Sequence, residues 1–226
     1  MSFRPLTVVF VLAALAAILG AMLGGGMPGG DALWLHYIGK PLATLLLFWQ
    51  VLRSSDALSV RYRRAVAIGM ALSLVGDVCL MLPGDLFVPG LVAFLLAHIG
   101  YIVAFAPGSS GKARGVAFVM VAIVGAANLY GLLPRVDPAL KIPVVAYTVV
   151  LAAMAAFALA RAWTPAVAAV LPRSARFGAV GAVLFMTSDS LLAWDRFGGG
   201  IPMSALLVLG TYYAAQWCIA RSVERG

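Results

Sequence analysis

The sequence predicts an all-α fold, a polytopic integral membrane bundle of eight transmembrane helices with both termini on the cytoplasmic side. Of the 226 residues, 63% are hydrophobic and only 11% are charged, whereas soluble domains contain roughly 45–50% and 25%. Apolar runs of about 20 residues recur along the chain, which is the length that crosses a bilayer. The basic residues gather at alternate ends of these runs, as cytoplasmic loops require.

The apolar runs are separated by Gly, Pro and charged residues, and they define the expected helices in order. These cover residues 6–24, 36–53, 63–82, 86–106, 114–133, 142–161, 175–194 and 202–221. Pro83–Gly84 is expected to stop the third helix and Pro107–Gly108 the fourth, because proline cannot continue a helix. No segment is long or polar enough for a soluble domain, so residues 1–226 are expected to form a single transmembrane domain.

The first apolar run has two interpretations. Arg4 precedes the run 6–23, which is the order found in a signal peptide. The run is long for a signal peptide, and no small-x-small cleavage site precedes Gly24. We therefore expect a retained first helix that ends at the Gly24–Gly26 cluster. Cleavage would leave seven helices in the same orientation.

The basic residues that give the net charge of +8 are distributed as in a membrane protein rather than as in a nucleic-acid-binding protein. Across the eight helices, 12 of the 16 basic residues fall on one side, and the other four are Lys40, Arg135, Lys141 and Arg196. This asymmetry predicts cytoplasmic termini, and the Ala-, Val- and Gly-rich helices favour a bacterial inner membrane. Stripes of small residues suit packing within one chain or between chains, so the oligomeric state stays open.

A faint internal repeat accompanies this organisation. Lys40–Pro41 near the start of the second helix matches Lys141–Ile142–Pro143 at the start of the sixth. The stretch 76–80 in the third helix matches 188–192 in the seventh. Helices four apart run in the same direction, so the pattern is that of a parallel 4+4 repeat.

Two carboxylates stand inside apolar helices. Asp77 and Asp189 have no basic neighbour in the sequence to neutralise them. A charge at membrane depth costs at least a few kcal/mol, so such residues face a bundle interior or a wet cavity and serve a function. A structural hydrogen bond between helices is the alternative. Asp77 lies six residues before Pro83 and Asp189 six residues before Asp195, so both are about 9 Å below the outer helix ends and share a layer.

Other polar side chains are candidates for binding a substrate. They are Lys40, His98, Tyr101, Asn128, Tyr130, Tyr147, Ser188, Tyr212, Tyr213 and Gln216. Spacing places Tyr212 and Gln216 on one helix face. No His, Cys and carboxylate spacing indicates a metal site, and phosphate-loop and serine-elbow motifs do not occur, so we expect no metal and no cofactor. Cys79 and Cys218 lie in apolar runs and do not indicate a disulfide.

Several blocks of the chain resemble the YhhN-like membrane proteins, the lysoplasmalogenase family. The blocks are Lys40–Pro41–Leu42, 76–83, Phe94 to His98 with Tyr101, 184–185, 188–190, Arg196–Phe197, and 209–213 with Gln216. The resemblance implies a hydrolase that acts on the vinyl ether bond of a lysophospholipid in the bilayer, lysoplasmalogen. It would give a fatty aldehyde and a glycerophospho-ethanolamine or glycerophospho-choline, and it would depend on both intramembrane aspartates.

The chemistry of that reaction suits two carboxylates. A vinyl ether is protonated on carbon, and water then adds to the resulting cation, which calls for an acid and an anionic group. Asp189 as the acid and Asp77 as the base is one assignment, and the reverse is also open. Lys40 is expected to meet the substrate phosphate. The alternatives are a small proton-coupled transporter, which also carries intramembrane aspartates, and a lipid-binding protein without turnover.

Overall fold

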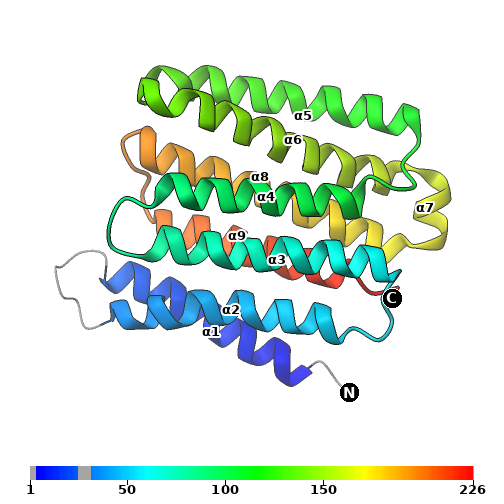
Figure 1. Ribbon diagram of the computed structural model, residues 1–226, viewed down its shortest axis with the longest axis horizontal. Coiled ribbons are helices and arrows are strands. Elements are labelled where there is room, and N and C mark those ends of the chain that lie inside the picture. Colours follow the sequence, from blue (N-terminus) through cyan, green and yellow to red (C-terminus); the bar gives the residue numbers. More distant parts are fainter. Residues whose placement is uncertain (1–3, 25–31, 226) are drawn as a thin grey trace.

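The computed structural model describes residues 4–24 and 32–225, and these form an all-α bundle of nine helices (Figure 1). The helices are α1 (Arg4–Gly24), α2 (Leu33–Arg53), α3 (Val60–Met81), α4 (Phe87–Phe105), α5 (Gly111–Leu132), α6 (Lys141–Trp163), α7 (Pro165–Val170), α8 (Pro172–Phe197) and α9 (Ser204–Arg221). Two short 3-10 turns, Leu133–Arg135 and Pro138–Leu140, connect α5 to α6. Of the Gly24–Gly26 cluster, only Gly24 lies within the described residues.

Eight long helices agree with the eight predicted ranges to within a few residues at each end. The short helix α7 is the difference, and it was not predicted because six residues carry no membrane-length signal. Six helices, α1, α3, α4, α5, α6 and α8, are long and apolar enough to cross a membrane. The polar side chains of α2 and α9 make these two helices less apolar. The chain is therefore an integral membrane protein with several spans.

Helix ends follow the expected local chemistry. Ser59 caps α3 by accepting a hydrogen bond from the Tyr62 backbone N–H, and Ser110 caps α5 in the same way. Gly84 and Gly108 follow α3 and α4 with φ of +107° and +84°, a backbone conformation that glycine adopts without strain. The predicted stops at Pro83–Gly84 and Pro107–Gly108 are therefore confirmed.

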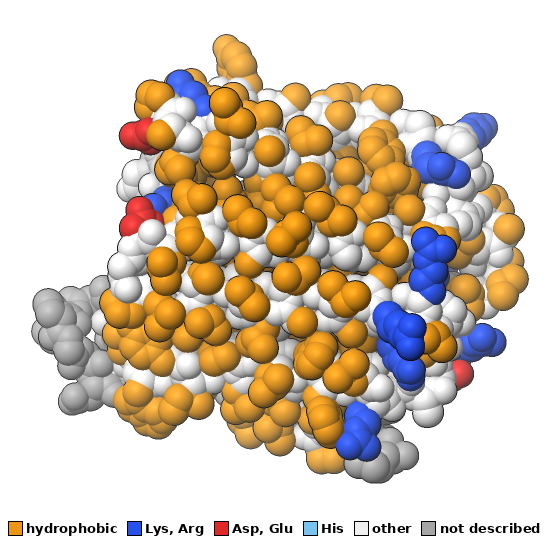
Figure 2. Space-filling model, viewed as in Figure 1, with side chains coloured by type: hydrophobic (Ala, Val, Ile, Leu, Met, Phe, Trp, Pro, Cys, Tyr) orange, Lys and Arg blue, Asp and Glu red, His pale blue; other side chains and the backbone are white. Residues whose placement is uncertain are grey.

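Apolar and charged side chains divide along the bundle axis. Figure 2 shows hydrophobic side chains across the middle of one face, with most Lys and Arg side chains at the end where both termini lie in Figure 1. That end, the basic end, contains the connections from α2 to α3, α4 to α5 and α6 to α8. The opposite end contains the connections after α3, α5 and α8. Asp77 and Asp189 lie toward the opposite end.

Helices α3 and α4 cross closely. A Cβ on Gly100 would lie 3.2 Å from the Gly69 backbone nitrogen, and a Cβ on Gly69 would collide with the Tyr101 ring. Glycine at both positions lets the two backbones approach and leaves room for Tyr101 in the core. This crossing fixes the position of α3, which carries Asp77.

We expect Gly69→Ala to lower the free energy of unfolding by about 1–3 kcal/mol, because the added methyl overpacks the crossing. Gly115→Ala on α5 is the matched control, since a Cβ there meets open space. Its unfolding should be unchanged or slightly stabilised. Thermal unfolding in detergent measures both, and a Gly69→Ala midpoint at or above wild type would contradict the close crossing.

Candidate active site

Asp77 on α3 is held by three side chains from two other helices. Its carboxylate is 1% exposed, and its Oδ2 accepts hydrogen bonds from Thr44 Oγ1 at 2.7 Å and from the Tyr212 hydroxyl at 2.6 Å. Lys40 Nζ lies 3.6 Å from Oδ1. Lys40 and Thr44 stand one turn apart on α2 and so reach the same carboxylate. Asp77 thus has a buried counter-ion, which comes from another helix rather than from a neighbour in the sequence.

A chain of hydrogen bonds extends from Asp77 into the middle of the bundle. Gln216 Nε2 donates to the Tyr212 oxygen at 3.1 Å, and the Tyr101 hydroxyl donates to Gln216 Oε1 at 3.0 Å. The Ser73 and Tyr101 hydroxyls are 3.2 Å apart. The prediction that Tyr212 and Gln216 share a helix face is confirmed. The chain fixes the Tyr212 ring, which keeps its hydroxyl directed at Asp77.

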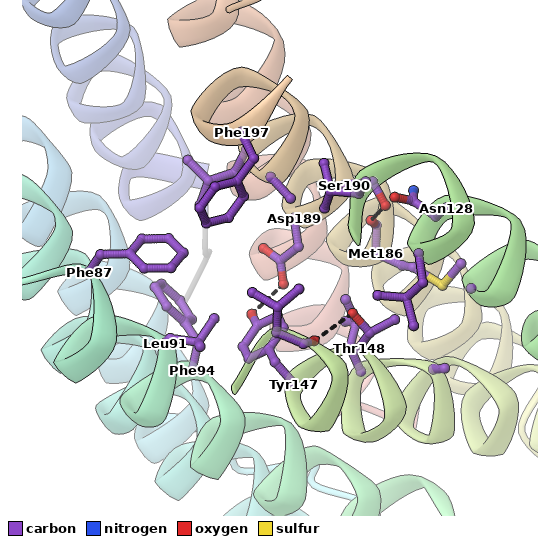
Figure 3. Close-up of a pocket in the computed structure, with 18 of the residues that line it drawn as sticks. Phe87, Leu91, Phe94, Asn128, Tyr147, Thr148, Met186, Asp189, Ser190 and Phe197 are labelled. Atoms are coloured by element: carbon purple, nitrogen blue, oxygen red, sulfur yellow. Dashed lines mark hydrogen bonds between the residues drawn. The ribbon is translucent and has the colours of Figure 1, made fainter. Parts of the chain in front are cut away.

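Asp189 on α8 has different surroundings. The Tyr147 hydroxyl of α6 donates to its Oδ2 at 2.5 Å, as Figure 3 shows, and His98 Nε2 lies 3.8 Å from the same oxygen. Among the described residues, Oδ1 has no hydrogen-bond partner, and no lysine or arginine forms an ion pair with this carboxyl group. Its side chain is 12% exposed. The two acids therefore differ chiefly in that one is paired with a cation and the other is not.

Aromatic rings surround both acids. The Phe185 ring centroid lies 4.8 Å from that of His98, 5.5 Å from Tyr212 and 6.0 Å from Phe94. The Phe94 and Tyr212 centroids are 5.9 Å apart. His98 is fully buried, and neither ring nitrogen has a hydrogen-bond partner in the part of the chain that the structure describes. These rings make the space around the acids mostly apolar.

Two hollows meet at Asp189. The first, the polar pocket, occupies about 700 Å³ with its mouth and is lined by both aspartates, Lys40, His36 and Tyr212 among others. The second, the apolar cavity, occupies about 790 Å³ with its mouth and lies between α4, α5, α6 and α8. Leu80, Phe94, Asp189 and Leu192 line both hollows. Both acids therefore line the polar pocket, and Asp189 also lines the apolar cavity, which Figure 3 shows.

Most of the residues singled out in the sequence come together here. Asn128 lines the apolar cavity, and Ser188 lines the polar pocket while donating to the Val208 carbonyl at 2.9 Å. Tyr130 does not reach the site, because its side chain is 87% exposed and lies two residues past Asn128, on another face of α5. The Tyr213 ring packs against Phe10 at 6.3 Å and lines neither hollow.

Sequence reasoning missed Thr44, Ser73, His36 and Phe94. Thr44 and His36 each lie one turn from Lys40, and Ser73 lies one turn before Asp77. Projecting polar residues onto the helix faces of Lys40 and Asp77 would have found these three. Phe94 has no such signal. Among the described residues, no three His, Cys, Asp or Glu side chains are grouped to hold a metal ion.

The fold and the site define a polytopic membrane protein with two buried carboxyl groups that line one polar pocket, which meets an apolar cavity at Asp189. The chain belongs to the YhhN family, whose model matches residues 35–223. This confirms the resemblance noted in the sequence.

Named relatives cover most of the chain. Lysoplasmalogenase TMEM86B from Homo sapiens is 33% identical over 201 residues, which is 88% of this chain and 80% of that protein. Lysoplasmalogenase TMEM86A from Bos taurus is 28% identical and covers 87% of this chain and 81% of its own length. Lysoplasmalogenase from Mycobacterium tuberculosis is 36% identical, with 69% and 59% covered. No solved structure matches the chain.

We expect Lys40→Met to cost about 3–5 kcal/mol in the free energy of unfolding, because Asp77 would keep a buried charge without its counter-ion. The double variant Lys40→Met with Asp77→Asn should recover most of that loss, since no charge then remains buried. Lys141→Met, which replaces an exposed lysine at the start of α6, should stay within about 0.5 kcal/mol of wild type. Unfolding in mixed micelles gives all three values, and losses that simply add in the double variant would contradict the pairing.

Proposed function

We propose that this protein hydrolyses the vinyl ether bond of lysoplasmalogen, releasing a fatty aldehyde and a glycerophospho-ethanolamine or glycerophospho-choline. The observation that carries the proposal is the position of Asp189, which lines both the polar pocket and the apolar cavity. Membership in the YhhN family and the named lysoplasmalogenases support it.

The two hollows suit a single-chain amphiphile. In the proposed complex the head group lies in the polar pocket near Lys40 and His36, and the hydrocarbon chain lies in the apolar cavity. The vinyl ether joins head group and chain, so it falls at the junction of the hollows beside Asp189. Lys40 is already paired with Asp77, and its remaining N–H donors are the ones available to a phosphate oxygen.

The difference between the acids supports a division of roles. Asp77 accepts two hydrogen bonds and faces Lys40, which favours the carboxylate form. Asp189 borders the apolar cavity and has no lysine or arginine partner among the described residues, which favours the neutral acid, with its proton on the unpartnered Oδ1. We assign Asp189 as the general acid and Asp77 as the general base. Tyr147 orients Asp189 through Oδ2.

The reaction then proceeds in balanced steps. Asp189 transfers its proton to the vinyl carbon that is not bonded to oxygen, which leaves an oxocarbenium cation stabilised by the anionic Asp77. Water adds to the carbon bonded to oxygen and gives its proton to Asp77. The resulting hemiacetal breaks its bond to the glycerol oxygen as its hydroxyl proton is transferred to that oxygen, giving the aldehyde and the alcohol. A proton passed from Asp77 to Asp189 restores the starting state.

We expect Asp77→Asn and Asp189→Asn each to lower aldehyde release by about 10²–10⁴-fold, because each removes an acid–base group. Asp85→Asn is the matched control, since Asp85 is exposed and paired with Arg196. The assay uses purified protein in detergent, where no sealed compartment exists, so aldehyde release distinguishes hydrolysis from proton-coupled transport. Near-normal turnover in either variant, with unfolding like that of wild type, would rule out the two-carboxylate mechanism.

We propose further that all eight long helices cross the membrane with both termini in the cytoplasm, in a bacterial inner membrane. Each long helix runs opposite to the preceding one, and the basic end carries both termini (Figure 1). Helices α2 and α9 carry the polar residues of the site toward the bundle interior, which explains how less apolar helices are accommodated.

Reporter fusions test this orientation. A fluorescent protein fused after Gly226 should be bright, and alkaline phosphatase inserted between Gly199 and Gly200 should be active, because that enzyme matures only in an oxidising compartment. When the two reporters are exchanged, we expect neither fluorescence nor phosphatase activity. Phosphatase activity at the C-terminus would place that end outside and contradict the orientation.

A further inference from the structure

A groove on the outer face of α5 and α6 lies directly behind the apolar cavity. The groove occupies about 660 Å³ with its mouth, and its lining is almost entirely apolar. Gly125, Leu129, Thr148 and Ala152 line both the groove and the cavity. We call these four residues the seam. The space beside Asp189 and the lipid-facing surface are therefore separated only by the seam.

Small side chains make the seam thin at its centre. A Cβ placed on Gly125 would lie 3.8 Å from Thr148 Cγ2 and 4.0 Å from Ala152 Cβ. Larger rings pack the contacts on either side. Phe118 meets Phe157 edge to face at 5.0 Å nearer the basic end, and the Trp194 ring packs against Gly131 nearer the opposite end. The thin part of the seam therefore lies at Gly125.

Helix α5 forms the border of the bundle, farthest from α1 and α2 in Figure 1, and it packs mainly on α6. Its outward side chains, which include Val119, Ile123 and Val124, are exposed and apolar. Hydrocarbon is the solvent that such a surface accepts. The groove therefore opens to the membrane interior rather than to water.

We infer that the hydrocarbon chain of the substrate passes between α5 and α6 at Gly125, so that its far end lies in the bilayer. The inference rests on the proposed function. The head group then occupies the polar pocket, the vinyl ether lies beside Asp189, and the first part of the chain fills the cavity. The rest of the chain leaves through the seam. The same opening returns the fatty aldehyde to the membrane.

This route has a consequence for substrate choice. A closed cavity limits chain length, because methylenes beyond its end have no space. A cavity that opens at Gly125 accepts chains of any length, since the additional methylenes remain in lipid. Narrowing the seam should convert the open site into one that selects short chains. Gly125 and Ala152 are thereby assigned as determinants of chain length.

The test compares lysoplasmalogens with alkenyl chains of about six and about sixteen carbons in protein reconstituted into lipid nanodiscs. Gly125→Leu should lower kcat/KM for the long chain relative to the short chain by about tenfold or more. Gly115→Leu is the matched control on the same helix, because Gly115 faces open space and lines neither the apolar cavity nor the groove. It should keep the ratio of wild type.

The outcomes separate the two proposals. If wild type releases no aldehyde from any chain length, the proposed function fails. If wild type is active and Gly125→Leu keeps its long-to-short ratio, the route through the seam is wrong. If Gly125→Leu loses activity toward both chain lengths and shows no thermal unfolding transition, the variant is misfolded. The ratio is then measured for Ala152→Leu, which narrows the seam from α6. A tenfold lower ratio supports the route, whereas an unchanged ratio or an equal loss of both rates overturns it.

Discussion

The burial of two carboxyl groups in an apolar bundle is the constraint on which the rest of the site depends. A carboxylate removed from water is stable only with hydrogen-bond donors or a counter-ion, and without them it takes up a proton. Asp77 receives two hydroxyl donors and Lys40, whereas Asp189 receives the Tyr147 hydroxyl and no cation. The same residue type thus has two environments, which is the arrangement that acid–base catalysis by a carboxyl pair requires.

The surrounding fold maintains this difference. The glycine crossing of α3 and α4 makes room for Tyr101, whose hydroxyl joins the chain that fixes Tyr212 beside Asp77. On the other side the apolar cavity keeps polar groups away from Asp189 and extends toward α5 and α6. Polarity therefore falls from the pocket near Lys40, across Asp189, to the lipid-facing groove, in the same order as along a lysophospholipid.

Hydropathy predicted the eight long helices, because each apolar run has membrane length, and the Pro–Gly pairs at 83–84 and 107–108 predicted two of their stops. The two aspartates were predicted for the opposite reason, as charged residues where none is expected. Lys40 and Tyr212 were expected at the site, but their pairing with Asp77 was not predictable, since the packing of α2 and α9 around α3 brings together residues distant in sequence. Tyr130 and Tyr213 were chosen by residue type and depth, and a step of one or two residues on a helix decides which face such a ring occupies. The short helix α7 was not predicted, because its six residues are too few to give a membrane-length signal.

Infrared difference spectroscopy of the resting protein tests the central claim, that one buried aspartate is neutral and the other ionised. The stretching band of a protonated carboxyl group, identified by its shift in heavy water, should be present in wild type. It should be absent from Asp189→Asn and retained in Asp77→Asn. A band that disappears in Asp77→Asn and persists in Asp189→Asn would contradict the account.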